Sequence, residues 1–192
     1  RAGFNNNNIQ LLYRKTYPKA GKELTADGSF NFGGGNNGYI FSTYATALSG
    51  TTNIANEFQK NNGNSNSRQG TFQMDYVNPI SETTKFETGI KAFYKNSYSE
   101  NAAQRATASQ DNYSKDTSMS NQYVINDMVN AAYVNYSSQT FWKINYQAGL
   151  RFEQSYYKGS ITDKNQSFSY SYPSSADDIM KSLFPGIYLS RK

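Results

Sequence analysis

The chain has 192 residues, a formal net charge of +5, and neither Cys nor His. Without these residue types there is no disulfide, cysteine nucleophile, Ser-His-Asp triad or thiolate or imidazole metal site, and no Asp-rich loop has calcium-binding spacing. Lys and Arg occur singly rather than in basic runs, which indicates solvated charge rather than a nucleic-acid interface. The sequence therefore predicts a protein that is not an enzyme, holds no cofactor and binds no nucleic acid.

Aromatic residues reach 16% of the chain, although hydrophobic residues in total make up only 36%. Disordered chains are poor in aromatics, so this composition indicates folded structure. No apolar stretch approaches the 18 residues of a transmembrane helix, and the first residues lack the apolar core of a signal peptide. Low hydropathy with abundant Tyr and Phe is typical of β-sheets that have one polar and one apolar face.

In the first half of the chain, less polar residues recur at every second position, which is the period of a strand with two different faces. The expected strands are Ile9–Tyr17, Glu23–Phe32, Thr71–Tyr76 and Thr84–Tyr94. In the last of these, one face carries Phe86, Thr88, Ile90, Ala92 and Tyr94, and the other carries Lys85, Glu87, Gly89 and Lys91.

The clearest alternation lies in Phe141–Tyr157, which we expect to be one long strand. One face carries Trp142, Ile144, Tyr146, Ala148, Leu150 and Phe152, and the other carries Lys143, Asn145, Gln147, Gly149, Arg151 and Glu153. A strand in a soluble sheet is usually five or six residues long, whereas one that crosses a bilayer at a tilt needs roughly 9–11. Tyr123–Tyr136 also has strand composition, but two sets of apolar positions compete there, so its facing stays open.

The connections between these strands alternate in length. Tight hairpins are expected at Pro18–Gly21, Asn78–Thr83 and Ser137–Thr140, all at one end of the sheet. Long polar connections are expected at Gly33–Gly70, Asn96–Gln122 and Lys158–Ser182. An antiparallel membrane barrel has this arrangement, with short periplasmic turns and long external loops, whereas a soluble sandwich has no reason to separate the two kinds.

The long connections have features of their own. Tyr39–Leu48 is a candidate hairpin arm above the membrane. The Asn-rich run Asn61–Asn66 is expected to be a mobile loop tip. Ser175–Ser182 is the one segment with a helical pattern, because it opens with two Asp residues that are followed by apolar ones.

Five segments in chain order show a further pattern: Tyr17–Asp27, Gln73–Ser81 with Lys85–Lys91, Asn130–Tyr133, Gln147–Glu153 and Leu183–Ser190. The second reads QMDYVNPIS followed by KFETGIK, and the fourth reads QAGLRFE. Together these segments resemble the strands of the Bacteroidetes outer-membrane β-barrel family, which is related to TonB-dependent receptors. The resemblance implies a large antiparallel barrel in the bacterial outer membrane, an N-terminal plug domain, and TonB-coupled uptake of a large nutrient or metal chelate.

The expected fold is all-β: an antiparallel up-and-down transmembrane β-barrel with about seven membrane strands and long external loops. Bacterial single-chain barrels have even strand numbers, and an open edge in lipid leaves backbone groups unsatisfied. We therefore expect residues 1–192 to be a segment of a single, larger barrel domain. Its expected partners are outer-membrane lipid, the plug and the TonB system through other parts of the chain, and an outer-membrane lipoprotein or complex partner.

Two groups of residues are candidates for function. Lys85, Glu87, Lys91, Arg151 and Glu153 are expected to face the lumen, where they either contact a plug or substrate or are simply tolerated by water. The loop aromatics Tyr156, Tyr157, Tyr170 and Tyr172 either stack on a ligand or extend an interfacial aromatic girdle. Asp75, beside the Asn78-Pro79 turn, is expected to be a structural cap.

Three function classes follow from these patterns. The first is a transport barrel of the TonB-dependent type. The second is a non-transporting outer-membrane barrel that acts as an anchor or assembly partner. The third is a secreted β-sandwich that binds ligands. An upstream plug domain would separate the first two classes, and a requirement for detergent would separate both from the third.

Overall fold

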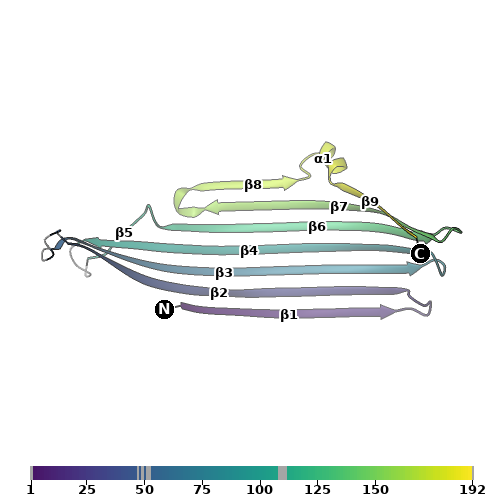
Figure 1. Ribbon diagram of the computed structural model, residues 1–192, viewed down its shortest axis with the longest axis horizontal. Coiled ribbons are helices and arrows are strands. Elements are labelled where there is room, and N and C mark those ends of the chain that lie inside the picture. Colours follow the sequence, from purple (N-terminus) through teal and green to yellow (C-terminus); the bar gives the residue numbers. More distant parts are fainter. Residues whose placement is uncertain (1, 47, 49, 51–52, 108–111, 192) are drawn as a thin grey trace.

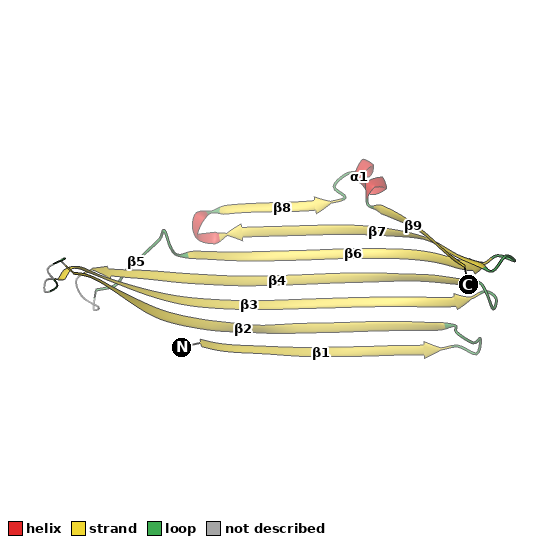
Figure 2. Ribbon diagram, viewed as in Figure 1, coloured by secondary structure: helices red, strands yellow, loops and turns green. Residues whose placement is uncertain are grey.

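The computed structural model describes residues 2–46, 48, 50, 53–107 and 112–191, which form a single antiparallel sheet (Figures 1 and 2). Neighbouring strands follow the order β1-β2-β3-β4-β6-β7, and β7 pairs on its other side with both β8 and β9. The strands are β1 (Ala2–Thr16), β2 (Glu23–Thr46), β3 (Asn53–Pro79), β4 (Lys85–Thr107), β5 (Ser114–Lys115), β6 (Asn121–Gln139), β7 (Ile144–Ile161), β8 (Gln166–Tyr172) and β9 (Leu183–Arg191). The predicted up-and-down antiparallel topology is confirmed.

The three short connections lie at the same end of the sheet, as predicted (Figure 1). The β1–β2 turn is closed by a hydrogen bond from the Tyr17 amide to the Lys22 carbonyl at 3.0 Å. The β3–β4 turn is closed by the Ile80 amide and the Thr84 carbonyl at 2.8 Å. Gly21 supplies the positive φ of 75° that the first of these turns requires.

The β6–β7 turn falls later than the sequence predicted. β6 continues to Gln139, and the reversal is closed by the Thr140 amide and the Ile144 carbonyl at 2.9 Å. Trp142 and Lys143 therefore belong to the turn, and Lys143 adopts a φ of 59° that no strand residue has. The predicted strand start at Phe141 is wrong, because the aromatic residues of the turn happen to continue the alternation of the strand.

The segments expected as long loops are mostly strands, so those local predictions are wrong. β2 and β3 form a paired arm that extends far beyond the expected strand ends, and β4 continues beside them (Figure 1). Residues 61–66, expected to be a mobile tip, lie inside β3 with β2 on one side and β4 on the other. Asn, Ser and Gly have weak intrinsic strand propensity, but backbone pairing on both sides overrides it. The candidate arm Tyr39–Leu48 is confirmed over residues 39–46, which lie in β2, whereas residue 47 lies outside the described residues.

The chain between β8 and β9 leaves the sheet through a short helix, α1 (Ala176–Lys181), as the sequence predicted. Its N-cap is Ser175, whose side chain accepts a hydrogen bond from the Asp178 amide. Asp177 and Asp178 lie in the first turn, where negative charge complements the helix dipole. No helix in the described part of the chain is long and apolar enough to cross a membrane.

The register carries the two-residue alternation from strand to strand, because directly opposed residues point to the same face. We call one side the apolar face. It holds Ile9, Leu11 and Tyr13 of β1, Leu24, Ala26 and Phe30 of β2, Phe72, Met74 and Tyr76 of β3, Phe86, Ile90 and Tyr94 of β4, Met128, Ala132, Val134 and Tyr136 of β6, Ile144, Tyr146, Ala148, Leu150 and Phe152 of β7, and Leu183, Ile187 and Leu189 of β9. The opposite side is the polar face, and the facing of β6 is thereby settled.

The apolar face is uncovered within the described residues. Leu11 is 73% exposed and Ile187 is 75% exposed, while the buried hydrophobic side chains are small or lie in the arms. A β-sandwich packs two sheets face to face, but the described chain forms one layer. A contiguous apolar surface of this kind requires a non-aqueous neighbour.

The apolar band runs obliquely across the strands. On β2 it begins at Leu24, which the register places level with Leu150 of β7 through Tyr76, Thr88 and Val134. On β7, however, the band begins six residues earlier, at Ile144. Six residues are about 20 Å along a strand, and the four strand spacings between β2 and β7 are about 19 Å, so the strands tilt by roughly 45° against the band. Membrane barrels tilt by about 35–45°.

Candidate functional site

The register brings the five charged candidates onto one face. Lys91 of β4 lies level with Glu153 of β7 through Ala131 of β6, and Arg151 lies level with Gly89 through Tyr133. Lys85 and Glu87 share this polar face. The sequence did not show that these β4 and β7 residues lie level with each other, because the facing of β6 between them was undetermined.

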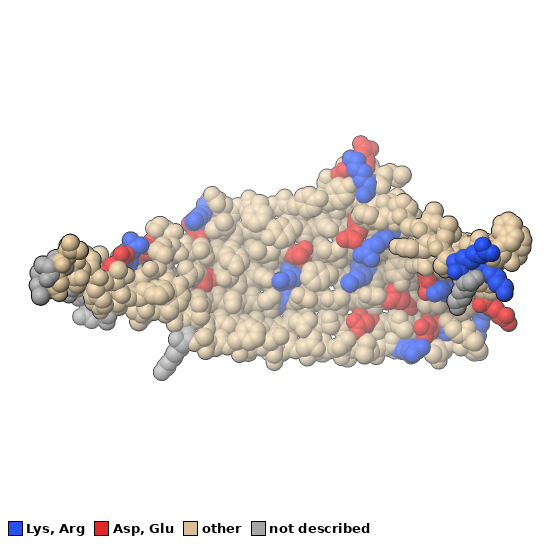
Figure 3. Space-filling view, in the orientation of Figure 1, with Lys and Arg blue, Asp and Glu red and all other residues tan. Residues whose placement is uncertain are grey.

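Four of the five charged candidates form pairs along their strands. Lys85 Nζ lies 3.0 Å from Glu87 Oε1, and Arg151 donates to Glu153 Oε2 from two nitrogens, at 3.1 and 2.9 Å. These side chains remain partly exposed, so such pairs contribute little stability and stay available to a partner. Figure 3 shows charged side chains gathered over the half of the sheet that ends in the short turns.

A glycine-centred bridge crosses three strands at the centre of this charged region. Tyr133 Oη donates a hydrogen bond to Asp75 Oδ1 at 2.6 Å, and Gln73 Nε2 donates to Asp75 Oδ2 at 2.8 Å. Gly89 lies between Asp75 and Tyr133 in the ladder, and a Cβ there would collide with both side chains. The absence of a side chain on Gly89 therefore lets the Tyr133 ring reach across β4.

Sequence analysis missed this bridge and assigned Asp75 wrongly. Asp75 lies within β3 and does not cap the turn. The available signal was a glycine on the charged face of a strand that otherwise alternates without interruption. Its partner, Tyr133, could not be identified, because the facing of β6 was undetermined from sequence.

The four aromatic candidates do not form one group. Tyr156 lies on the apolar side, level with Tyr94 and Met128. The other three lie on the polar side within β7 and β8, and none of the four is in a loop. Tyr157 stacks on Phe168 with a centroid distance of 5.7 Å, and Tyr170 stacks on Tyr172 at 6.3 Å. Phe168 is thus a member of this cluster that the sequence analysis omitted.

The polar face presents hydrogen-bonding groups, paired charges and aromatic rings. Glu87, Glu153 and Asp75 are engaged with Lys, Arg, Tyr or Gln partners, and the described residues contain no group of three or more metal-binding side chains. The apolar face, with its oblique band as deep as a membrane span, matches the lipid-facing surface of an outer-membrane barrel.

A comparison with known protein families shows to which family the chain belongs. Residues 15–192 match the outer membrane protein beta-barrel family. The chain belongs to this family. It is therefore a protein of the bacterial outer membrane, and the apolar face of the barrel wall is turned to lipid.

Two solved structures are similar to this chain. The ferric citrate transporter FecA, in its unliganded form, shows 14% identity and a TM-score of 0.40, with 85% of this chain and 23% of that chain covered. BauA, the ferric preacinetobactin receptor from Acinetobacter baumannii, shows 12% identity and a TM-score of 0.48, with 100% and 29% covered. The chain spans less than a third of the length of either protein. A search of curated protein sequences found no match.

Proposed function

We propose that residues 1–192 form part of the wall of a large TonB-dependent-type receptor barrel of the Bacteroidetes kind. The polar face lines a wet lumen, and the complete protein takes up a large nutrient or metal chelate without acting as an enzyme. A plug domain and the TonB system act through other parts of the protein.

The observation that supports a large barrel is the shallow curvature of the sheet. The strands from β1 to β7 lie side by side in one view without curling back on themselves (Figure 1). In an eight-stranded barrel, these six neighbouring strands would travel round about three quarters of the circumference, and side chains would fill the interior. A wide barrel instead leaves a lumen that can hold a plug or pass a large solute.

The charge on the polar face supports a lumen that is wet or filled by another domain. Lys91 lies level with the middle of the apolar band on β4, and Arg151 lies within the band on β7. Charge at this depth is costly unless it faces water or a polar partner. The proposal assigns Lys85, Glu87, Lys91, Arg151 and Glu153 to contact with the plug.

The test is uptake by cells that carry the intact parent receptor. A deletion strain with and without the restored gene is compared for uptake of radiolabelled ferric citrate, cyanocobalamin and maltoheptaose, with and without an uncoupler. Uptake of any probe that needs both the gene and the proton-motive force supports the proposal. Uptake equal to that of the deletion strain for every probe overturns it and favours a non-transporting barrel.

A charge-reversal pair tests the assigned face. Lys91→Glu on the polar face should reduce energy-dependent uptake at equal surface abundance. The matched control is Lys158→Glu, which reverses a lysine on the opposite side of the β7 arm, and it should leave uptake unchanged. Equal effects of the two variants would contradict the assignment of the polar face to the plug.

A further inference from the structure

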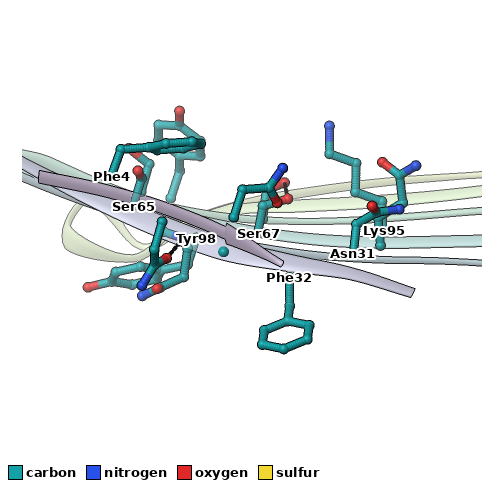
Figure 4. A pocket seen from close by; sticks show the side chains of 16 residues that line it. Phe4, Asn31, Phe32, Ser65, Ser67, Lys95 and Tyr98 are labelled. Atoms are coloured by element: carbon teal, nitrogen blue, oxygen red, sulfur yellow. Dashed lines mark hydrogen bonds between the residues drawn. The ribbon is translucent and has the colours of Figure 1, made fainter. Parts of the chain in front are cut away.

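Above the apolar band, the polar side of the arms is hollowed into a depression of about 590 Å³ (Figure 4). Ligand sites in proteins usually have volumes of about 300–1,000 Å³. Side chains from β1, β2, β3, β4 and β6 line it, so strands that are far apart in the sequence contribute together. We call this depression the trough.

The floor of the trough is made of small residues. Gly33 of β2 lies level with Ser67 and Ser97, and the Ser67 and Ser97 hydroxyls are 3.4 Å apart. A Cβ on Gly33 would collide with the carbonyl oxygen of Asn5 and the Cα of Asn6 in β1. The close approach of β1 and β2 therefore requires glycine here, and the hollow is part of the backbone arrangement.

Two exposed aromatic rings stand at the ends of one row of the trough. The register places Phe4 of β1 level with Tyr123 of β6 through Gly35, Ser65 and Ser99. Four strand spacings separate them, which is about 19 Å. Phe4 is 83% exposed and Tyr123 is 38% exposed, so both ring faces are accessible. Figure 4 shows Phe4 on the same side as Asn31 and Lys95, with Phe32 on the other side.

The membrane-side edge of the trough is a row of amides that ends in a balanced charge. Asn31 lies level with Gln69 and then with Lys95, whose register neighbour on β6 is Asp127. Lys95 is the one charged residue among those that line the trough, and Asp127, opposite it in the register, carries the opposite charge. Asn31 Oδ1 already accepts a hydrogen bond from Asn8 Nδ2 at 2.6 Å, and the Asn31 amide nitrogen can still donate. Amide side chains both donate and accept hydrogen bonds, so the row matches a ligand rich in hydroxyl groups rather than an anion.

We propose that the trough binds a short neutral oligosaccharide, which stacks its apolar ring faces on Phe4 and Tyr123 and bonds its hydroxyls to Asn31 and Gln69. This proposal rests on the proposed function, because it narrows the solute of the receptor to an uncharged sugar chain. A negatively charged metal chelate would instead require a cluster of unpaired cations. At its membrane-side edge the trough instead has the amides of Asn31 and Gln69 and a single lysine, Lys95, with a carboxylate opposite it in the register.

The test measures binding to the intact parent receptor in lipid nanodiscs by calorimetry. The probes are linear neutral glucans, mannans, galactans and xylans, with ferric citrate as the anionic comparison. Saturable binding of at least one neutral oligosaccharide, weakened about tenfold or more by Phe4→Ala, supports the proposal. The matched control is Phe30→Ala, which lies on the opposite side of β2 and does not line the trough, so it should leave the affinity unchanged. A second pair uses Asn31→Ala against Asn62→Ala, because Asn62 lies on the outer side of the arm and does not line the trough.

The outcomes separate this proposal from the proposed function. If none of the neutral oligosaccharides binds while ferric citrate or cyanocobalamin uptake is energy-dependent, the trough proposal is overturned and the proposed transport function remains supported. If an oligosaccharide binds with the expected variant pattern but no probe is taken up, the oligosaccharide site is supported and the proposed transport function is overturned. Equal loss in Phe4→Ala and Phe30→Ala, with both receptors folded, overturns the assigned site.

Discussion

An arginine placed on the lipid-facing side of β7 should destabilise the barrel far more than one placed at the adjacent residue. We compare Ala148→Arg with Gln147→Arg in the intact parent protein. Ala148 lies on the apolar face between Tyr136 of β6 and Ile187 of β9, whereas Gln147 lies on the polar face. Because alanine contributes little buried area, the cost of the first substitution is almost entirely the placement of charge in lipid.

The structure sets the magnitude through depth. Ala148 lies four residues from Ile144 and four from Phe152, the ends of the apolar band on β7. Four residues are about 13 Å along the strand, or about 9 Å along the membrane normal at a tilt of about 45°. Arg near the midplane of a barrel costs about 2–4 kcal/mol, which is about a 30- to 900-fold change in the folding equilibrium. Gln147→Arg, in the hydrated lumen, should change stability by no more than about 0.5 kcal/mol.

Ile144→Arg should cost less than Ala148→Arg, although both residues lie on the apolar face. Ile144 is the first residue of β7, directly after the turn, so an arginine there reaches headgroups and water. Its cost should be about 0–1 kcal/mol, as at other interfacial positions.

The measurement is reversible urea unfolding of the parent barrel from lipid vesicles, followed by fluorescence. Equal free-energy losses for Ala148→Arg and Gln147→Arg would refute the assignment of the two faces. A loss at Ile144 as large as that at Ala148 would refute the position of the band on β7.

Three further outcomes follow from the same structure. Gly89→Ala should lower the free energy of unfolding by about 1–3 kcal/mol because its Cβ meets two side chains, whereas Gly70→Ala, whose Cβ has its nearest neighbour at 3.8 Å, should be tolerated. In vesicles, Val129→Cys should react with a water-soluble maleimide and Met128→Cys should not, since adjacent residues of β6 face lumen and lipid; equal labelling would contradict the facing of β6. Hydrogen bonds from Ser118 hold the pKa of Asp116 below its usual value. The ionised carboxylate therefore stabilises the turn that Asp116 closes at any pH above the unfolded pKa, and the turn should lose protection from hydrogen exchange as the pH falls through the lower folded pKa, below about 4. Asp116→Asn should abolish this pH dependence.

Much of the fold is encoded locally. The alternation in 85–94 predicts which side chains share a face, because successive side chains of any strand point in opposite directions. Pro and Gly in the first hairpin mark a reversal for an equally local reason, namely their restricted or permissive φ. The seven strands β1, β2, β3, β4, β6, β7 and β9 that cross the apolar band agree with the number expected.

The arms illustrate where local patterns are insufficient. Residues 61–66 have the composition of a loop, and their strand state comes from hydrogen bonds to β2 and β4. The aromatic residues after Thr140 show the opposite error, because they continue an alternation through a turn that backbone pairing closes. In both cases a partner strand decides the conformation, and the identity of that partner is not written in the segment itself.

The fold class, the two faces and the end of the sheet that holds the short turns follow from local sequence patterns. Which residues meet across strands depends on how the strands pair. Tyr133 reaches Asp75 although they are 58 residues apart, and it does so over a glycine of the strand between them. Phe4 and Tyr123 likewise share one trough. The physical reason is that register is a property of the paired sheet: a shift by one residue leaves every local pattern intact but moves each side chain to the opposite face.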